Sequence, residues 1–212
     1  ICEEPWCRVE RTGTEVCTRR HVKPGADGAA SLSPPGRACT PTNGVPPEKR
    51  AETFGSDMRA MDEPQPMSRL INWALTDLML EHGEIVMMGE DVGRKGGVYG
   101  VTQKLHQRFG PDRMIDTPLD EQSILGLAIG MGHNGFLPMP EIQFLAYLHN
   151  AEDQIRGEAA TLPFFSNGQF PNPMELRLAG LGYHKGFRGH FPNHKPLAPL
   201  RYSPGSSTLS HP

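Results

Sequence analysis

The sequence has 212 residues, enough for one ordinary domain and a flanking segment. Its formal net charge of −3 gives no electrostatic reason to expect a nucleic acid or an anionic membrane as a partner. No apolar run reaches the roughly 18 residues that a membrane-spanning helix needs, and the start, ICEEPWCRVERTG, lacks the pattern of a signal peptide. We therefore expect a cytoplasmic protein that binds neither nucleic acids nor membranes.

Residues 1–66 show no apolar periodicity and are predicted to form a disordered leader or linker. The stretch GADGAASLSPPGRACTPTNGVPPEKR buries too little apolar surface to offset the chain entropy lost on folding. The cysteines of the chain also lie here, and their spacing matches no common zinc site, so we interpret them as incidental thiols. They are Cys2, Cys7, Cys17 and Cys39. A misread or out-of-frame leader is an alternative for this segment.

Beyond residue 66 the pattern changes to alternating helices and strands. Apolar residues at helical spacing predict a helix in SRLINWALTDLMLEHG, with Ser68 as its N-cap and Gly83 as its stop. The predicted strands are EIVMMGED, RMIDTP, FLPMPEIQF and MELRLAG. Further helices are expected in VTQKLHQRFG, from Glu121 to Gly135, and in LAYLHNAEDQIRGEAATL. This alternation indicates an α/β fold, a mostly parallel sheet with helices on both faces.

The predicted organisation has three parts: the leader over residues 1–66, the α/β domain over residues 67–182 and a divergent, incomplete tail over residues 183–212. Prolines exclude a regular helix over much of the tail. In parallel α/β sheets, ligands bind at the carboxyl ends of the strands. We therefore expect the functional site where GED, DTP and EIQF converge.

Two features that could suggest a phosphate or metal site do not support one. GRKGGVYG, from Gly93 to Gly100, has neither the P-loop order nor G-x-G-x-x-G, so we favour a flexible loop. The histidines of the C-terminal part form no H-E-x-x-H or similar ligand pair, and no protein-only metal site is expected. These histidines include His133, His149, His184, His190 and His194.

Glu121 is the most informative carboxylate. A carboxylate in the first turn of a helix can simply complement the helix dipole, which spacing alone favours. However, the helix behind it, ILGLAIGMG, is small and apolar on every side, which predicts that the helix and its first turn are buried. A buried carboxyl group has a raised pKa and can act as a proton donor near neutral pH. Asp116 and Asp120 are interpreted as turn and cap residues.

Three segments carry a resemblance to a known family: GEDVGRKGGVYGVTQKL, FGPDRMIDTPLDEQSILGLAIGMGHNGFLPMPEIQF and YLHNAEDQI. They resemble the beta subunit of thiamine-diphosphate-dependent 2-oxo acid dehydrogenases, the decarboxylating component of the pyruvate and branched-chain 2-oxo acid dehydrogenase complexes. The most specific combination is D-T-P-x-x-E, a small-residue helix, and P-x-x-E-I-Q-F. The resemblance covers about Pro66 to Gly182 and implies a transketolase-like pyrimidine-binding domain.

The resemblance implies roles for individual residues. Glu121 matches the catalytic glutamate that hydrogen-bonds the aminopyrimidine ring of thiamine diphosphate. Gln143 and Tyr147 match residues that line the aminopyrimidine pocket, and Glu90 matches an acidic position in the polar passage between paired active sites. Ordinary core packing is an equal alternative for Tyr147, judged without the family. The implied activity is oxidative decarboxylation of a 2-oxo acid, branched-chain rather than pyruvate, with acyl transfer to a lipoyl group.

The sequence also departs from the family. Pro192 stands where the family has a substrate-facing histidine, and His190, two residues earlier, is the candidate catalytic substitute. The half that binds the diphosphate and Mg²⁺ is missing, as is the family's C-terminal domain, so the chain is expected to be a truncated form that holds half a cofactor site. The implied partners are an alpha-type chain and a lipoyl-bearing acyltransferase, in a hetero-oligomer. The alternatives are a catalytically silent fragment that acts by association, or another transketolase-like enzyme.

Overall fold

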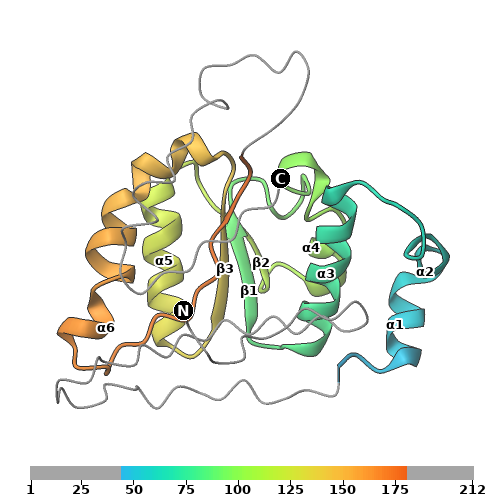
Figure 1. Cartoon of the computed structure of the whole chain (residues 1–212), viewed down its shortest axis with the longest axis horizontal. Coiled ribbons are helices and arrows are strands. Elements are labelled where there is room, and N and C mark those ends of the chain that lie inside the picture. The colour runs from blue at the N-terminus through green and yellow to red at the C-terminus, as the bar shows by residue number, and fades with distance from the viewer. Residues whose placement is uncertain (1–43, 181–212) are drawn as a thin grey trace, which may run out of the picture.

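The computed structural model describes residues 44–180, which are built around a four-stranded sheet (Figure 1). The strands lie in the order β2-β1-β3-β4, and each neighbouring pair is parallel. They are β1 (Ile85–Gly89), β2 (Met114–Asp116), β3 (Leu137–Ile142) and β4 (Arg177–Leu178). The predicted parallel sheet is therefore confirmed, with its two longest strands, β1 and β3, at the centre.

The helical segments vary widely in length. The α-helices are α1 (Pro47–Phe54), α2 (Asp57–Ala60), α3 (Met67–Glu81), α4 (Leu105–Phe109), α5 (Glu121–His133) and α6 (Leu162–Phe165). Two 3₁₀ segments, η1 (Val98–Gly100) and η2 (Leu145–Ala151), and a π-helical segment, η3 (Gln154–Ala159), complete them. None of the helices between residues 44 and 180 is long and apolar enough to cross a membrane.

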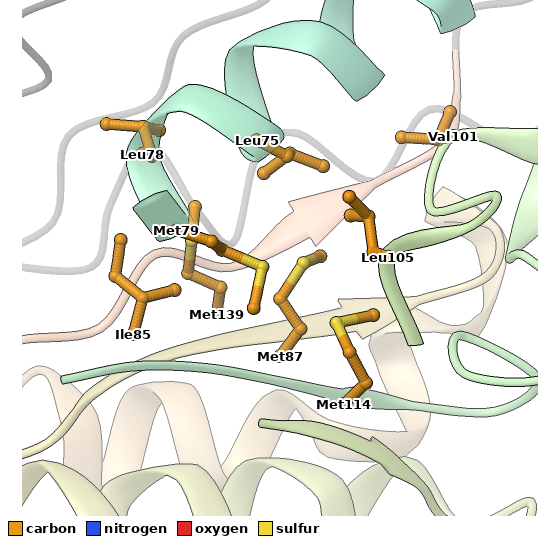
Figure 2. Close-up of a cluster of buried hydrophobic side chains, with 9 residues drawn as sticks. All are labelled: Leu75, Leu78, Met79, Ile85, Met87, Val101, Leu105, Met114 and Met139. Atoms are coloured by element: carbon orange, nitrogen blue, oxygen red, sulfur yellow. The ribbon is translucent and has the colours of Figure 1, made fainter. Parts of the chain in front are cut away.

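Strand β1 is buried along its whole length and serves both faces of the sheet. Because side chains alternate along a strand, Ile85 and Met87 pack with α3, whereas Val86 and Met88 pack with α5. Figure 2 shows the α3 side, where Met87 and Ile85 lie beneath Leu75 and the neighbouring apolar side chains. Figure 1 shows α3 and α4 on one side of the sheet and α5 and α6 on the other, as predicted.

The prediction of a disordered leader up to residue 66 is wrong for residues 47–60, which form α1 and α2. These helices are held by a few strong contacts rather than by a periodic apolar face. Phe54 is buried, and the guanidinium groups of Arg50 and Arg108 lie 5.6 and 5.7 Å from its ring. Arg50 also pairs with Asp77 of α3 at 2.9 Å. Residues 1–43 of the predicted leader and the predicted tail lie outside the described residues.

Helix α3 begins one residue before the predicted N-cap. Pro66 occupies the capping position in an extended conformation, with φ −57° and ψ 143°, and Ser68 lies inside the helix. Proline suits this position because its φ is fixed and because it has no backbone N–H that would need a hydrogen-bond partner. The helix ends at Glu81, because His82 is already extended, so Gly83 follows the end by two residues.

Two predicted helices are shorter or irregular. Helix α4 begins only at Leu105, because Lys104 has a left-handed backbone conformation with φ 67°, which a right-handed helix does not contain. The predicted long helix after β3 is divided into η2 and η3. Buried Leu145, Leu148 and Ala151 are spaced three apart, which matches the three-residue turn of a 3₁₀ helix and directs all three into the cluster around Leu125 of α5.

Candidate functional site

The carboxyl ends of β1, β2 and β3 meet at one polar edge of the sheet. Gly89, the last residue of β1, pairs with Asp116 of β2 on one side and with Glu141 of β3 on the other. Glu90 and Gln143 follow β1 and β3, and Gln143 donates its side-chain amide to the carbonyl of Glu90 at 3.4 Å. The convergence of these three strand ends, which parallel strands require, agrees with the prediction from GED, DTP and EIQF.

Glu121 is the first residue of α5, which follows β2 at the same edge. Its carboxylate is half-buried and accepts a hydrogen bond from the side-chain amide of Asn150 at Oε2, 3.2 Å away. The prediction that α5 is buried on every side is wrong in this structure, since Gly126 and Leu127 are exposed. The apolar character of the helix exceeds what its contacts within the described residues account for.

Glu90 is a carboxyl group of this edge whose pKa is raised. Partial burial raises the pKa of Glu90, and the negative charges of Asp91 and Glu121 raise it further, while Lys95 acts in the opposite direction. Burial and a nearby like charge both disfavour the ionised form of a carboxyl group. Glu90 and Glu121 therefore form an interacting pair of carboxyl groups, although sequence reasoning had assigned the raised pKa to Glu121.

Tyr147 lies in η2 and is half-buried. It packs against the apolar cluster around Leu125 and meets Phe144 edge to face, with the ring centroids 5.8 Å apart. The packing interpretation of Tyr147 therefore has direct support, and its predicted contact with a pyrimidine stays a prediction. His190 and Pro192 lie outside the described residues, so the predicted catalytic role of His190 also stays a prediction.

Of the two aspartates interpreted as turn and cap residues, Asp120 lies at the N-cap position, whereas Asp116 is the last residue of β2. The Asp116 carboxylate accepts hydrogen bonds from the backbone N–H groups of Gly93 and Arg94, at 2.6 and 3.2 Å, and so holds the glycine-rich loop to β2. Asp120 occupies the N-cap position of α5. A hydrogen bond from the Ser123 hydroxyl lowers the pKa of Asp120, which keeps it ionised at the positive end of the helix dipole.

Three charged residues behind the edge were not singled out from the sequence. Glu141, only 4% exposed, forms an ion pair with Arg177 of β4 at 2.9 Å. Burial raises the pKa of the Glu175 carboxyl, against the opposing charge of Arg177. The sequence could have indicated Glu141 as a site residue, because it is the first residue of the E-I-Q-F motif that contains Gln143. No motif includes Glu175 or Arg177. Asn150 was missed because an exposed asparagine in a predicted helix has no pattern of its own.

The described residues contain no group of three or more His, Cys, Asp or Glu side chains that could hold a metal ion. The side chains gathered at the edge are instead carboxylates and the amides of Gln143 and Asn150. Such a set suits a flat, nitrogen-rich ring that donates and accepts hydrogen bonds. Asp91 joins Glu90 and Glu121 in making this part of the site negatively charged.

Comparisons with known proteins agree with this picture. Residues 63–164 match the family model described as transketolase, pyrimidine binding domain. The pyruvate dehydrogenase E1 component subunit beta of Staphylococcus epidermidis is 42% identical over 119 residues, which are 56% of this chain and 37% of that protein. The 3-methyl-2-oxobutanoate dehydrogenase subunit beta of Mycobacterium tuberculosis is 36% identical over 136 residues, 64% of this chain and 39% of that protein.

A third relative is the 2-oxoisovalerate dehydrogenase subunit beta of Pseudomonas aeruginosa, 44% identical over 103 residues, 48% of this chain and 29% of that protein. The parallel sheet with its polar edge is thus a transketolase-like pyrimidine-binding domain. Over residues 63–164 the chain matches this domain, and it is similar to the beta subunits of 2-oxo acid dehydrogenases. It spans between 29% and 39% of the length of these three relatives.

Proposed function

We propose that the chain supplies the pyrimidine-binding half of a thiamine diphosphate site in a 2-oxo acid dehydrogenase. The observation that carries the proposal is the position of Glu121 at the head of α5, beside the strand ends that bear Glu90 and Gln143. When bound, thiamine diphosphate supplies an electron sink for the carbanion left by loss of CO₂. The enzyme would oxidatively decarboxylate a 2-oxo acid and pass the acyl group to a lipoyl arm.

The side chains at the edge fit the aminopyrimidine ring. The Glu121 carboxyl would hydrogen-bond a ring nitrogen, since the Asn150 amide engages its Oε2 and orients the group. Gln143 offers an amide and Tyr147 an aromatic face to the ring. Glu90, with its raised pKa, would hold a proton next to Glu121 and return it as the charge of that carboxyl group changes.

The same charges argue that the diphosphate binds elsewhere. Glu90, Asp91 and Glu121 concentrate negative charge at the strand ends, which repels a diphosphate. We therefore propose that an alpha-type chain holds the diphosphate and Mg²⁺, and that the active form is a hetero-oligomer served by a lipoyl-bearing acyltransferase. The names of the relatives include both pyruvate and branched-chain enzymes. We propose branched-chain 2-oxo acids ahead of pyruvate as substrates, on general likeness.

The alternative is a catalytically silent chain that associates with partners. The observation that favours it is Pro192, which stands where the family has its substrate-facing histidine. Another transketolase-like enzyme is less well supported, because the three relatives described above carry the names of 2-oxo acid dehydrogenase beta subunits.

The deciding assay is 2-oxo-acid-dependent reduction of an artificial acceptor by the chain paired with the alpha chain of a relative's complex. Activity should fall on the order of 10²–10⁴-fold in Glu121→Gln, the range for a general acid–base group. Asp120→Asn, one residue earlier, is the matched control and should retain activity. Absence of activity in every pairing would favour the silent chain.

Calorimetric titration with thiamine diphosphate and Mg²⁺ tests the half-site directly. We expect binding only when the alpha chain is present. Tight binding to the chain alone would contradict the shared site.

A further inference from the structure

A pocket of about 190 Å³ lies beside the glycine-rich loop, at the start of α4. This volume is several times the roughly 30 Å³ that one water molecule occupies in the liquid. It is also below the roughly 300 Å³ at which pockets for drug-sized ligands begin. The size suits a small ion or one group of a larger ligand. The lining residues are Gly93, Arg94, Lys104, His106 and Gln107.

Each polar side chain that lines this pocket can donate a hydrogen bond. Arg94 and Lys104 carry positive charges, Gln107 offers an amide, and His106 offers an imidazole. Within residues 44–180, neither Arg94 nor Lys104 has an acidic side chain as a partner. A guanidinium fork combined with an ammonium group is the typical recognition chemistry of phosphate oxygens.

The acidic groups near the pocket are already engaged. Asp91 pairs with Lys95 at 2.9 Å, and Asp116 accepts the backbone N–H groups of Gly93 and Arg94. These amides are therefore not available as a backbone phosphate cradle, in agreement with the loop's lack of a P-loop sequence. Any anion in this pocket would be bound by side chains, and the charges of Arg94 and Lys104 are available to it.

The backbone that carries the pocket is held in an unusual conformation. Lys104 has φ 67°, and Asp91 and Tyr99 in the same segment have φ 60° and 56°. Non-glycine residues persist in this region where their surroundings fix them, and such residues gather at ligand sites. Here the side-chain amide of Asn72 from α3 donates to the carbonyls of Val101 and Gln103, at 2.8 and 3.0 Å, directly before Lys104.

We propose that the pocket formed by Arg94, Lys104, His106 and Gln107 binds a phosphate group, either as free phosphate or on a small organic phosphate. The donors come from two segments, the loop after β1 and the start of α4, which Asp116 and Asn72 fix at their bases. The site adjoins the polar edge through Asp116, whose carboxylate holds Gly93 and Arg94, but it uses other side chains and does not depend on the function proposed for Glu121.

The test is calorimetric titration of the 212-residue chain with inorganic phosphate and with glycerol 3-phosphate, at constant ionic strength set by chloride. We expect saturable binding that weakens on the order of tenfold in Arg94→Gln, as for the loss of one charge-assisted hydrogen bond. Lys104→Asn should weaken binding similarly, and asparagine tolerates the left-handed conformation. Tighter binding of one probe identifies the source of the phosphate group.

Lys95→Gln is the matched control. It removes the same charge from the same loop, but Lys95 pairs with Asp91 and does not line the pocket. The control should bind phosphate within about twofold of the unchanged chain, since the lost charge of Lys95 and the Asp91 charge that it leaves unpaired both act from outside the pocket lining and are screened. Equal weakening in Lys95→Gln and Arg94→Gln would overturn the proposal in favour of diffuse attraction, and so would the absence of saturable binding by both probes.

Discussion

Glu90 and Glu121 place two carboxyl groups from different elements within electrostatic reach of each other. The negative charge of Glu121 is one cause of the raised pKa of Glu90, after burial and Asp91. The folded chain therefore retains the Glu90 proton at a higher pH than the unfolded chain does. The stability contributed by this group is present below its ordinary pKa and is lost as the pH rises through the raised value.

Glu121→Gln should therefore lower the pKa of Glu90 toward its ordinary value, because one of the neighbouring negative charges is removed. Carbon-13 NMR titration of the Glu90 carboxyl group measures this without cofactor or partner. Asp120→Asn serves as the control, since Asp120 is not among the causes of the Glu90 shift. An unchanged Glu90 titration in Glu121→Gln would show that the two carboxyl groups do not interact.

Asn150 positions Glu121 through a single hydrogen bond of 3.2 Å between two partly or fully exposed side chains. Asn150→Ala should cost less than about 1 kcal/mol of unfolding free energy, as is usual for an exposed site. Asn150→Asp should weaken thiamine diphosphate binding in the paired protein more than Asn150→Ala does, because it sets a second negative charge against Glu121. Calorimetric titration with the alpha chain present measures the thiamine diphosphate affinity of both variants. Equal affinities of Asn150→Asp and Asn150→Ala would contradict the positioning role.

At the scale of the element, β3 and β4 are joined by a buried ion pair as well as by a short ladder. Glu141 and Arg177 have side chains 5% and 15% exposed, and they pair at 2.9 Å. Only two residue pairs connect the strands, because β3 ends at Ile142. Arg177→Met should destabilise the fold by about 3–5 kcal/mol, since it leaves the Glu141 charge buried without a partner.

Chemical denaturation measures this loss, and the double variant Glu141→Gln/Arg177→Met is its control. Removing both charges should recover a large part of the stability, because no unpaired buried charge remains. A double variant as unstable as Arg177→Met would assign the loss to packing of the arginine side chain instead.

The elements that sequence patterns predicted well are those whose residues share one regular period. β1 is apolar throughout because both faces of a parallel strand are covered, and α5, predicted from about Glu121 to Gly135, spans Glu121–His133. α4 and η2 were predicted poorly for local reasons. The left-handed Lys104 and the three-residue spacing of Leu145, Leu148 and Ala151 depend on contacts with α3 and α5, which one segment does not reveal.

The candidate site shows the same division. Strand ends and the D-T-P-x-x-E motif indicated Glu90, Glu121 and Gln143, because parallel topology brings strand ends together. The contact from Asn150 to Glu121, the pair of Glu141 with Arg177, and the effect of Glu121 on the pKa of Glu90 each join residues more than twenty-five positions apart in the sequence. Such pairings have no periodic signature.

At the scale of the whole molecule, the first described helix is attached through one aromatic anchor. Phe54 is 4% exposed and lies between two arginine side chains, while the rest of α1 is largely exposed. Phe54→Ala should lower the unfolding free energy by about 3–5 kcal/mol if α1 unfolds with the core. Amide hydrogen exchange of residues 47–60 in this variant measures whether α1 is released alone, and protection equal to the unchanged chain would contradict the anchoring role.

Several large apolar side chains remain exposed on the part of the chain that follows β2. They are Leu119, Leu127, Phe136, Phe164, Phe165 and Phe170. Exposed apolar side chains mark sites of association where they gather into a patch. This surface supports the proposed hetero-oligomer, because an alpha-type chain would remove these side chains from water.

The alpha chain should therefore stabilise this chain by mass action, by about 2.7 kcal/mol when its free concentration is 100 times the dissociation constant. Leu127→Lys, on the exposed side of α5, should change the stability of the chain alone by no more than about 0.5 kcal/mol, as is usual for surface sites, and should weaken this stabilisation. Leu70→Lys is the matched control, because Leu70 is 44% exposed, against 43% for Leu127, and lies on α3, on the other side of the sheet (Figure 1). Thermal unfolding with and without the alpha chain measures both effects, and equal stabilisation of the two variants would place the contact away from α5.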